Sequence, residues 1–156
     1  MRSRAHIISG ALMGGAVLAL TGNIDAAVLC GAGNVISDTD HLLEYGIYCM
    51  KHRTKPSKNA FMSGTYFSEK GTLGVVFHAH EYIAALTVAD CLLWKKNRRL
   101  AENLAAFTAG YGMHMLLDLI GNDCTWKGYS ILYRASVRFD EKTICSRNRR
   151  KNADIQ

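Results

Sequence analysis

Two residues that could bind a metal ion lie four positions apart in an apolar segment. His114 and Asp118 share one face of a helix, because four residues make about one helical turn. The residues around the pair are apolar: Met113, Met115, Leu116, Leu117, Leu119 and Ile120. A helix of this kind is buried, and a buried carboxylate needs a counter-charge, which a divalent cation would supply. Small residues near the same stripe, Gly110 and Gly121, would leave room for an ion or a substrate. The alternative is an ordinary His–Asp pair on a helix surface.

A second candidate pair, His78 and Glu81, lies in the apolar segment 72–94. A helix over this range places the two residues, three positions apart, on one face. His80 would then point roughly 200° away from His78, so one straight helix does not direct both imidazoles at one ion. We therefore expect His78 to be a metal ligand and Glu81 to be a ligand or the general base. His80 is either a hydrogen-bonded core histidine or a ligand of a second ion.

A third group follows an apolar segment, as Ser37-Asp38-Thr39-Asp40-His41. Two carboxylates and an imidazole in so short a stretch suit metal binding. Capping of the next helix would explain only one of these polar residues. We expect Asp38 and Asp40 to be metal ligands. On physical grounds His6 is the weakest candidate, because a single histidine on an apolar face is more often structural than a ligand. His52, in the basic 51–70 connection, stays unassigned.

The donor types indicate which metal this chain would bind. Histidine and carboxylate ligands without thiolates suit zinc, manganese or iron, and zinc best matches a hydrolytic reaction. Several carboxylates can also bridge two ions about 3.5–4 Å apart.

Helices must position these residues. The chain of 156 residues contains one proline and long Ala/Leu/Gly runs, and few stretches alternate with period two, so we expect an all-α single bundle of about five helices. The predicted helices cover residues 5–20, 24–36, 42–50, 72–94 and 100–120. Asn23 would cap the second helix, residues 51–70 would form a polar connection, and residues 126–139 would be a short helix or extended pieces. The domain would cover residues 1–141, followed by a basic, disordered tail over 142–156.

Charge and cysteine content bear on localisation. The formal net charge is +6, and the basic C-terminal residues suit either a solvated tail or contact with an acidic membrane or nucleic acid. The five cysteines are odd in number and include no C-x-x-C pair, so we expect thiols in a reducing compartment and no disulfide-bonded secreted protein. The apolar runs before residue 36 are each shorter than the roughly 20 residues of a bilayer span. They could form a hairpin in a core or in a membrane, so the protein would be cytoplasmic or membrane-associated.

The candidate residues also follow a recognisable order along the chain. His6 in an apolar segment is followed by the 37–41 group, by His-x-x-Glu at 78–81 and by Gly-Tyr-x-x-His-x-x-x-Asp at 110–118. This order, over residues 5–122, resembles the membrane-associated metal-dependent hydrolases of bacteria and, more distantly, the zinc-dependent phospholipase C and nuclease fold. The resemblance implies a phospholipase C-like helical fold whose histidines and aspartates hold zinc ions that cleave phosphoesters.

The resemblance also implies a ligand set: His6, Asp40, His78 (or His80), His114 and Asp118. Asp118 would be able to bridge two ions. The chain has no histidine after His114 and lacks the His-Arg-Gly-x-x-His-Ser motif that the hydrolases often carry. We therefore expect one or two ions rather than three.

The expected function is a metal-dependent hydrolase that acts on a phosphoester through a metal-activated water. Basic residues could steer an anionic or lipid substrate: Arg98 and Arg99, or Lys51, Arg53 and Lys55 of the 51–70 connection, which could act as a lid. The alternative is a non-catalytic, metal-stabilised helical protein associated with the membrane, whose closed site has no position for water. Nucleic-acid binding through the basic tail is a third alternative that rests on composition alone.

Overall fold

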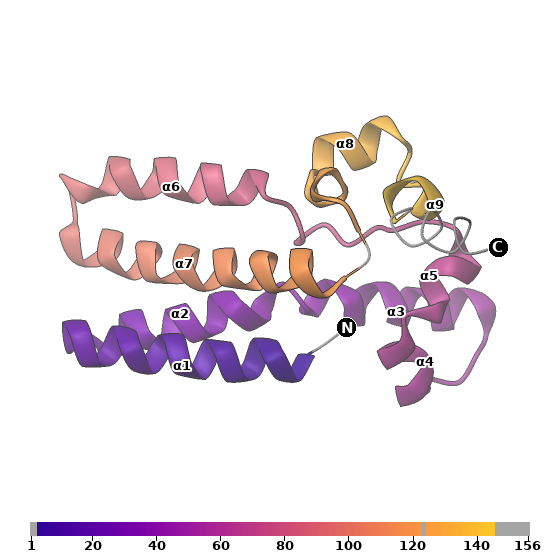
Figure 1. Ribbon diagram of the computed structural model, residues 1–156, viewed down its shortest axis with the longest axis horizontal. Helices are drawn as coiled ribbons and strands as arrows, with labels where there is room; N and C mark the ends of the chain where they lie inside the picture. The colour runs from indigo at the N-terminus through magenta and orange to yellow at the C-terminus, as the bar shows by residue number, and fades with distance from the viewer. Residues whose placement is uncertain (1–2, 123, 146–156) are drawn as a thin grey trace.

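The computed structural model describes residues 3–122 and 124–145 of the chain. This part of the chain is all-α, as predicted, and forms a four-helix bundle with a cap of further helices at one end (Figure 1). The bundle consists of α1 (Ser3–Thr21), α2 (Ile24–Ile36), α6 (Glu81–Trp94) and α7 (Arg98–Gly121). The cap consists of α3 (Thr39–His52), α4 (Lys58–Ser63), α5 (Thr65–Lys70), the 3-10 helix η1 (Trp126–Tyr129), α8 (Ile131–Ser136) and α9 (Glu141–Ile144).

The two hairpins of the bundle, α1–α2 and α6–α7, turn at the same end, which we call the tip (Figure 1). Asn23 caps α2 as predicted, since its side chain accepts hydrogen bonds from the amides of Asp25 and Ala26. The Asn23 amide also donates to Asn103 of α7 at 3.1 Å, and Arg99 pairs with Asp25 at 2.7 Å. These contacts hold the two turns together and fix the relative positions of the hairpins.

Helices α2 and α7 cross in close backbone contact. A Cβ atom added to Gly110 would lie 1.9 Å from the carbonyl oxygen of Cys30, and one added to Gly33 would lie 2.3 Å from that of Phe107. Only glycine permits this approach. The prediction that Gly110 leaves room for an ion or a substrate is therefore wrong, because the backbone of α2 fills that space.

The predicted helix over residues 72–94 begins only at Glu81. Residues 72–80 form a non-helical segment with turns, here called the His78 segment, which makes an isolated β-bridge between Thr72 and Asp140. The Tyr111 hydroxyl lies 2.7 Å from the carbonyl oxygen of Phe77, and the amide of His80 donates to the carbonyl of Tyr129 at 2.9 Å. Tertiary hydrogen bonds thus satisfy backbone groups that a helix would have paired internally.

The cap corrects one further prediction and decides between two alternatives. The polar connection over residues 51–70 contains α4 and α5, which pack against α3 through a cluster of Tyr45, Cys49 and Tyr66. Of the alternatives for residues 126–139, the helical one is confirmed by η1 and α8.

The C-terminal part of the fold extends past the predicted domain boundary. Ile144 of α9 is fully buried, and a disulfide joins Cys145 to Cys124, so residues 142–145 belong to the fold and the prediction of free thiols fails for this pair. Cys30 and Cys49 are buried thiols, whereas Cys91 is exposed. The predicted basic tail otherwise lies in residues 146–156, outside the described residues.

Candidate metal centre

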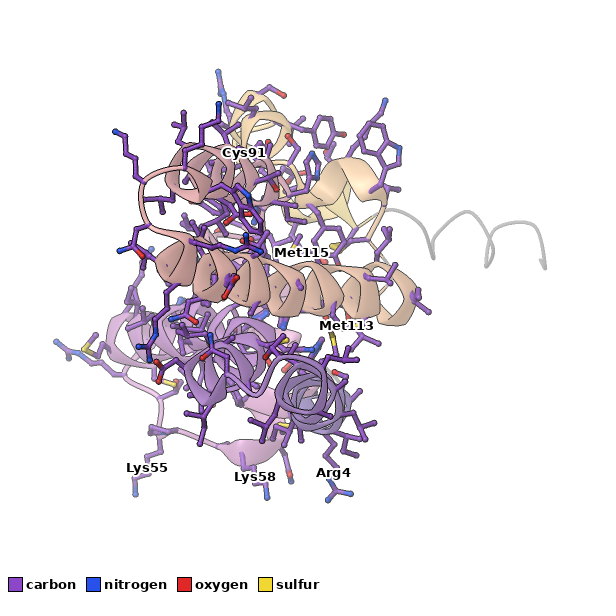
Figure 2. All side chains as sticks on the ribbon, turned by 90° about the vertical axis from the view of Figure 1, so that its left-hand side faces the viewer. Arg4, Lys55, Lys58, Cys91, Met113 and Met115 are labelled. Atoms are coloured by element: carbon purple, nitrogen blue, oxygen red, sulfur yellow. A yellow bond between two sulfur atoms is a disulfide. The ribbon has the colours of Figure 1, made fainter. Side chains whose placement is uncertain are left out.

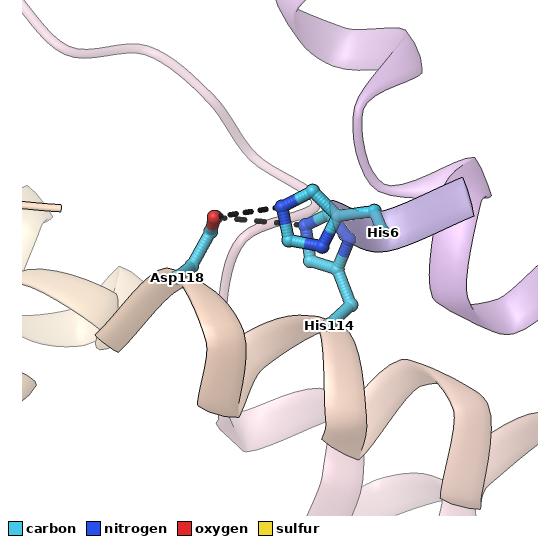
Figure 3. Close-up of side chains that lie close together, drawn as sticks. All are labelled: His6, His114 and Asp118. Carbon is cyan, nitrogen blue, oxygen red and sulfur yellow. Dashed lines mark hydrogen bonds and ion pairs between the residues drawn. The ribbon is translucent and has the colours of Figure 1, made fainter. Parts of the chain in front are cut away.

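Three imidazoles and one carboxylate meet where α1, α7 and the His78 segment come together. Asp118 Oδ1 lies 3.1 Å from Nε2 of His6, and Asp118 Oδ2 lies 3.3 Å from Nε2 of His78 and 3.5 Å from Nε2 of His114. Figure 3 shows His6 and His114 turned toward Asp118, with the two rings stacked at a centroid distance of 4.1 Å. All four side chains are buried. His6, whose role followed from the resemblance alone, therefore lies with His78, His114 and Asp118.

Asp38 adds a second carboxylate to this group. Its Oδ1 lies 3.8 Å from Nε2 of His78 and 4.0 Å from Nε2 of His114. Asp38 occupies the N-cap position of α3 but makes no side-chain capping bond, and its buried Oδ1 has no hydrogen-bond partner in the described part of the chain. Burial raises the pKa of Asp38, although the nearby histidines oppose this. The carboxylate thus faces the histidines and not the helix that it precedes.

Backbone and carboxylate contacts fix the tautomers of two of the imidazoles. His114 Nδ1 lies 2.8 Å from the carbonyl oxygen of Asn34, and this oxygen can only accept, so Nδ1 carries the hydrogen. His78 Nδ1 faces Asp40 Oδ2 at 3.2 Å, which favours a hydrogen on that nitrogen as well. The two Nε2 atoms then direct lone pairs at each other across 3.0 Å. A proton on one of the two Nε2 atoms would remove this repulsion, and so would a metal ion bound to both. The donor set therefore fits a bound metal.

The electrostatics of His78 follow from the same contacts. Burial opposes protonation of the ring, but hydrogen bonds with Asp118 and Asp40 outweigh burial and raise the pKa of His78 to about 9. In the metal-free protein the ring is therefore protonated at neutral pH. Histidine ligands of metals are commonly oriented by a carboxylate on the other ring nitrogen.

Asp40 is placed differently from its predicted role as a ligand in that cluster. Its Oδ2 accepts a hydrogen bond from the amide of Phe77 at 2.7 Å and faces Nδ1 of His78, not Nε2. Asp40 thus orients the His78 ring so that Nε2 faces Asp118 and His114. Asp40, His41 and His78 form a further group whose ligand atoms lie within 4.8 Å of one another, and burial together with His78 lowers the pKa of His41 to about 4.

Glu81 does not join the centre, contrary to the prediction from its spacing. Its Oε1 accepts a hydrogen bond from Ser130 at 2.5 Å, and its Oε2 accepts one from the amide of Ile131 at 3.2 Å. Because α6 begins at Glu81, this residue and His78 do not share a helical face. Glu81 instead binds the first backbone amides of α8.

The remaining histidines also lie apart from this cluster. The ring of His80 lies near that of Trp126, with a centroid distance of 6.2 Å, and the ring of His52 lies against that of Tyr48 at 4.6 Å. The structure places His78, and not His80, beside Asp118, although the geometric argument that separated the two histidines assumed a helix that is not present here.

A cavity of about 240 Å³ adjoins the centre on the side of the cap. His41, His78 and Asp118 form part of its wall, together with Tyr129 and Arg134. The segments 63–64 and 67–68 of the predicted lid also line it. The cavity provides space for water and a small substrate group beside the imidazoles.

Sequence reasoning missed three residues that support the centre. The Asn34 carbonyl fixes His114, and the Tyr111 hydroxyl and the Arg134 guanidinium bind the backbone of the His78 segment. Asn34 makes its contact through the backbone, so its side-chain type gave no signal for it. No spacing in the sequence pointed to Arg134.

Comparisons with protein-family models, with curated proteins and with solved structures found no match to this chain. The assignment of the centre therefore rests on its geometry, and the resemblance stays an expectation.

Proposed function

We propose that this protein is a metal-dependent hydrolase whose centre holds one or two divalent ions. The observation that carries the proposal is the 3.0 Å approach of the Nε2 atoms of His78 and His114, beside the carboxylate of Asp118 and an adjoining cavity. A site that only stabilised the fold would need no such cavity.

The ligands that we assign are His6, His78, His114 and Asp118. Nitrogen and oxygen donors without a thiolate suit zinc best, with manganese or iron as the nearest substitutes. A bound ion of this kind lowers the pKa of water to around 7 and polarises the scissile oxygen. Asp40 and the Asn34 carbonyl hold the rings of His78 and His114 in the required tautomers.

With Glu81 engaged by α8, another carboxylate must take the proton from the attacking water. We assign this role to Asp38, because its buried Oδ1 faces the centre and has no hydrogen-bond partner in the described part of the chain. Asp38 thereby replaces Glu81 as the candidate general base.

A phosphoester is the substrate that we propose, and the basic surface near the cap is consistent with an anion. Lys55 and Lys58 extend away from the molecule (Figure 2), and Lys51 and Arg53 are exposed. Arg98 and Arg99 are not suited to steer a substrate to this centre, because they lie at the tip, at the opposite end of the bundle from the cap (Figure 1).

We also propose that the bundle is embedded in a lipid bilayer. Arg4–Thr21 and Arg98–Gly121 are long and apolar enough to cross one. Only 17% of the first span and 33% of an 18-residue window of the second are buried, whereas the core helix of a soluble protein is mostly buried. Large apolar side chains are exposed on all four bundle helices, among them Ile8, Leu12, Val28, Val88, Leu92, Leu116 and Ile120. Over residues 5–21, 26–36, 82–94 and 100–117, Asp90 and Glu102 are the only Asp, Glu, Lys or Arg.

Metal analysis of the purified protein tests the proposed centre. We expect about one or two zinc ions per chain and loss of the metal in the double variant Asp118→Asn, His114→Ala. A double variant that kept its full metal content would contradict the ligand assignment.

A screen with phosphomonoester and phosphodiester substrates tests the proposed reaction. Metal without turnover under any condition would favour the alternative, a non-catalytic metal-stabilised protein. Carbonate extraction of membranes tests the embedding, which release of the protein into the supernatant would exclude.

A further inference from the structure

A guanidinium group is buried in the wall of the cavity beside the metal centre. Arg134 of α8 is 0% exposed, and its guanidinium donates to the carbonyl oxygens of Val75 and, at 2.7 Å, of His78. Its Nε has no hydrogen-bond partner in the part of the chain that the structure describes. Arg134 lines this cavity together with His78, Asp118 and Glu141, so a group bound in the cavity would lie near both the buried arginine and the centre.

Among residues 3–122 and 124–145, none of the ion pairs within 4.0 Å that the structure shows involves this guanidinium. Asp40 and Glu81 act on it only at longer range. A buried charge without a paired counter-charge is unfavourable, and a bound anion would supply the counter-charge that is missing here. A guanidinium also matches the planar pair of oxygens that a phosphoryl group presents.

A purely structural role explains part of this arrangement. The two hydrogen bonds to carbonyl oxygens brace the His78 segment and so help to place the His78 ring. Neutral donors would be sufficient for that bracing. It explains neither the full positive charge in the cavity wall nor the unpartnered Nε.

We propose that Arg134 is an anion-binding residue that receives a phosphoryl oxygen of the substrate in this cavity. The inference rests on the proposed function, because it concerns the substrate of the proposed hydrolase and assigns a phosphoryl group to that substrate. It deepens the proposal because the position of Arg134, and not the resemblance, now supplies the reason to expect a phosphoester.

Binding of inorganic phosphate to the zinc-loaded full-length protein, measured by calorimetry, tests the inference. We expect Arg134→Gln to weaken phosphate binding by about tenfold or more, since a charge-assisted hydrogen bond is lost. Arg98→Gln is the matched control, because Arg98 is exposed at the tip and pairs with Glu102, and its phosphate affinity should equal that of the wild type. A folded Arg134→Gln protein with wild-type zinc content and wild-type phosphate affinity would overturn the inference, because a residue that only braces the His78 segment would affect stability and not phosphate affinity.

A second measurement needs no folded Gln variant. The Nε–H resonance of Arg134, assigned by its absence in Arg134→Lys, should shift on titration of the wild-type protein with phosphate. An unchanged resonance at saturating phosphate would also overturn the inference.

Repeating the titration without metal separates this inference from the proposed function. If the protein binds no zinc but binds phosphate in a manner that depends on Arg134, the hydrolase proposal fails and the anion site stands. If zinc and turnover are present but phosphate affinity is independent of Arg134, the anion site fails and the hydrolase proposal stands.

Discussion

Substitution of Gly110 by alanine should damage the metal centre from a distance. The added Cβ would lie 1.9 Å from the carbonyl oxygen of Cys30, well below the 3.0 Å that Cβ contacts keep. Both atoms are rigidly attached to helices, so α2 and α7 must move apart by about 1 Å, because packed interiors do not absorb such an overlap. His114 lies one turn after Gly110 and Asn34 one turn after Cys30, so the same movement lengthens the 2.8 Å contact between His114 Nδ1 and the Asn34 carbonyl beyond hydrogen-bond range.

The magnitude follows from these two losses. Overpacking costs about 1–3 kcal/mol and the lost hydrogen bond about 1 kcal/mol, so the free energy of unfolding should fall by about 2–4 kcal/mol. A histidine ligand that loses its orienting contact lowers metal affinity by about 10- to 100-fold.

Gly112 provides a matched control on the same helix. A Cβ added there meets no atom within 4 Å, so Gly112→Ala should leave zinc affinity unchanged and stabilise the helix by up to about 1 kcal/mol. The assays are chemical denaturation of the metal-free protein and zinc competition against a chelator. The reasoning is refuted if the Gly110→Ala protein matches Gly112→Ala in both stability and zinc affinity.

Three further predictions concern the centre and its surroundings. The raised pKa of His78, about 9, means that the protonated ring stabilises the metal-free fold fully below about pH 6.5 and that this stabilisation is lost as the pH rises through about 9. Zinc must displace that proton, so the affinity of the protein for zinc should rise about tenfold per pH unit between about pH 7 and about pH 9. Competition titrations measure this affinity, and an affinity that does not change with pH would contradict the protonated state of His78. Asp40→Asn keeps the shape of the side chain but removes the charge that orients His78, so chelator competition should show zinc affinity about 10- to 100-fold lower in a protein of unchanged helical content. Glu81→Gln should destabilise the protein by about 1 kcal/mol in denaturant melts, because Glu81 binds the amides at the start of α8. Zinc content and activity should stay intact. Loss of activity without loss of stability would show that Glu81 has a catalytic role after all.

Local sequence patterns determined the helical class of this protein and the common helix face of His114 and Asp118. The apolar runs and the Asn23 cap predict α1, α2 and α7, because helix formation and capping depend on residues within a turn of one another. His114 and Asp118 lie on the same face of α7 because they are four residues apart in a helix, and this spacing does not depend on distant contacts.

Tertiary packing decided which other residues join that pair. His6 reaches Asp118 across 112 residues of sequence, and the start of α6 at Glu81 depends on bonds from Tyr111 and Arg134 to a segment that local propensity alone would make helical. The same packing turned Glu81 toward α8. Periodicity specifies the direction of a side chain around one helix axis, whereas a metal centre requires several helices to be positioned relative to one another. That positioning depends on contacts such as the one at Gly110, which form only when the chain folds.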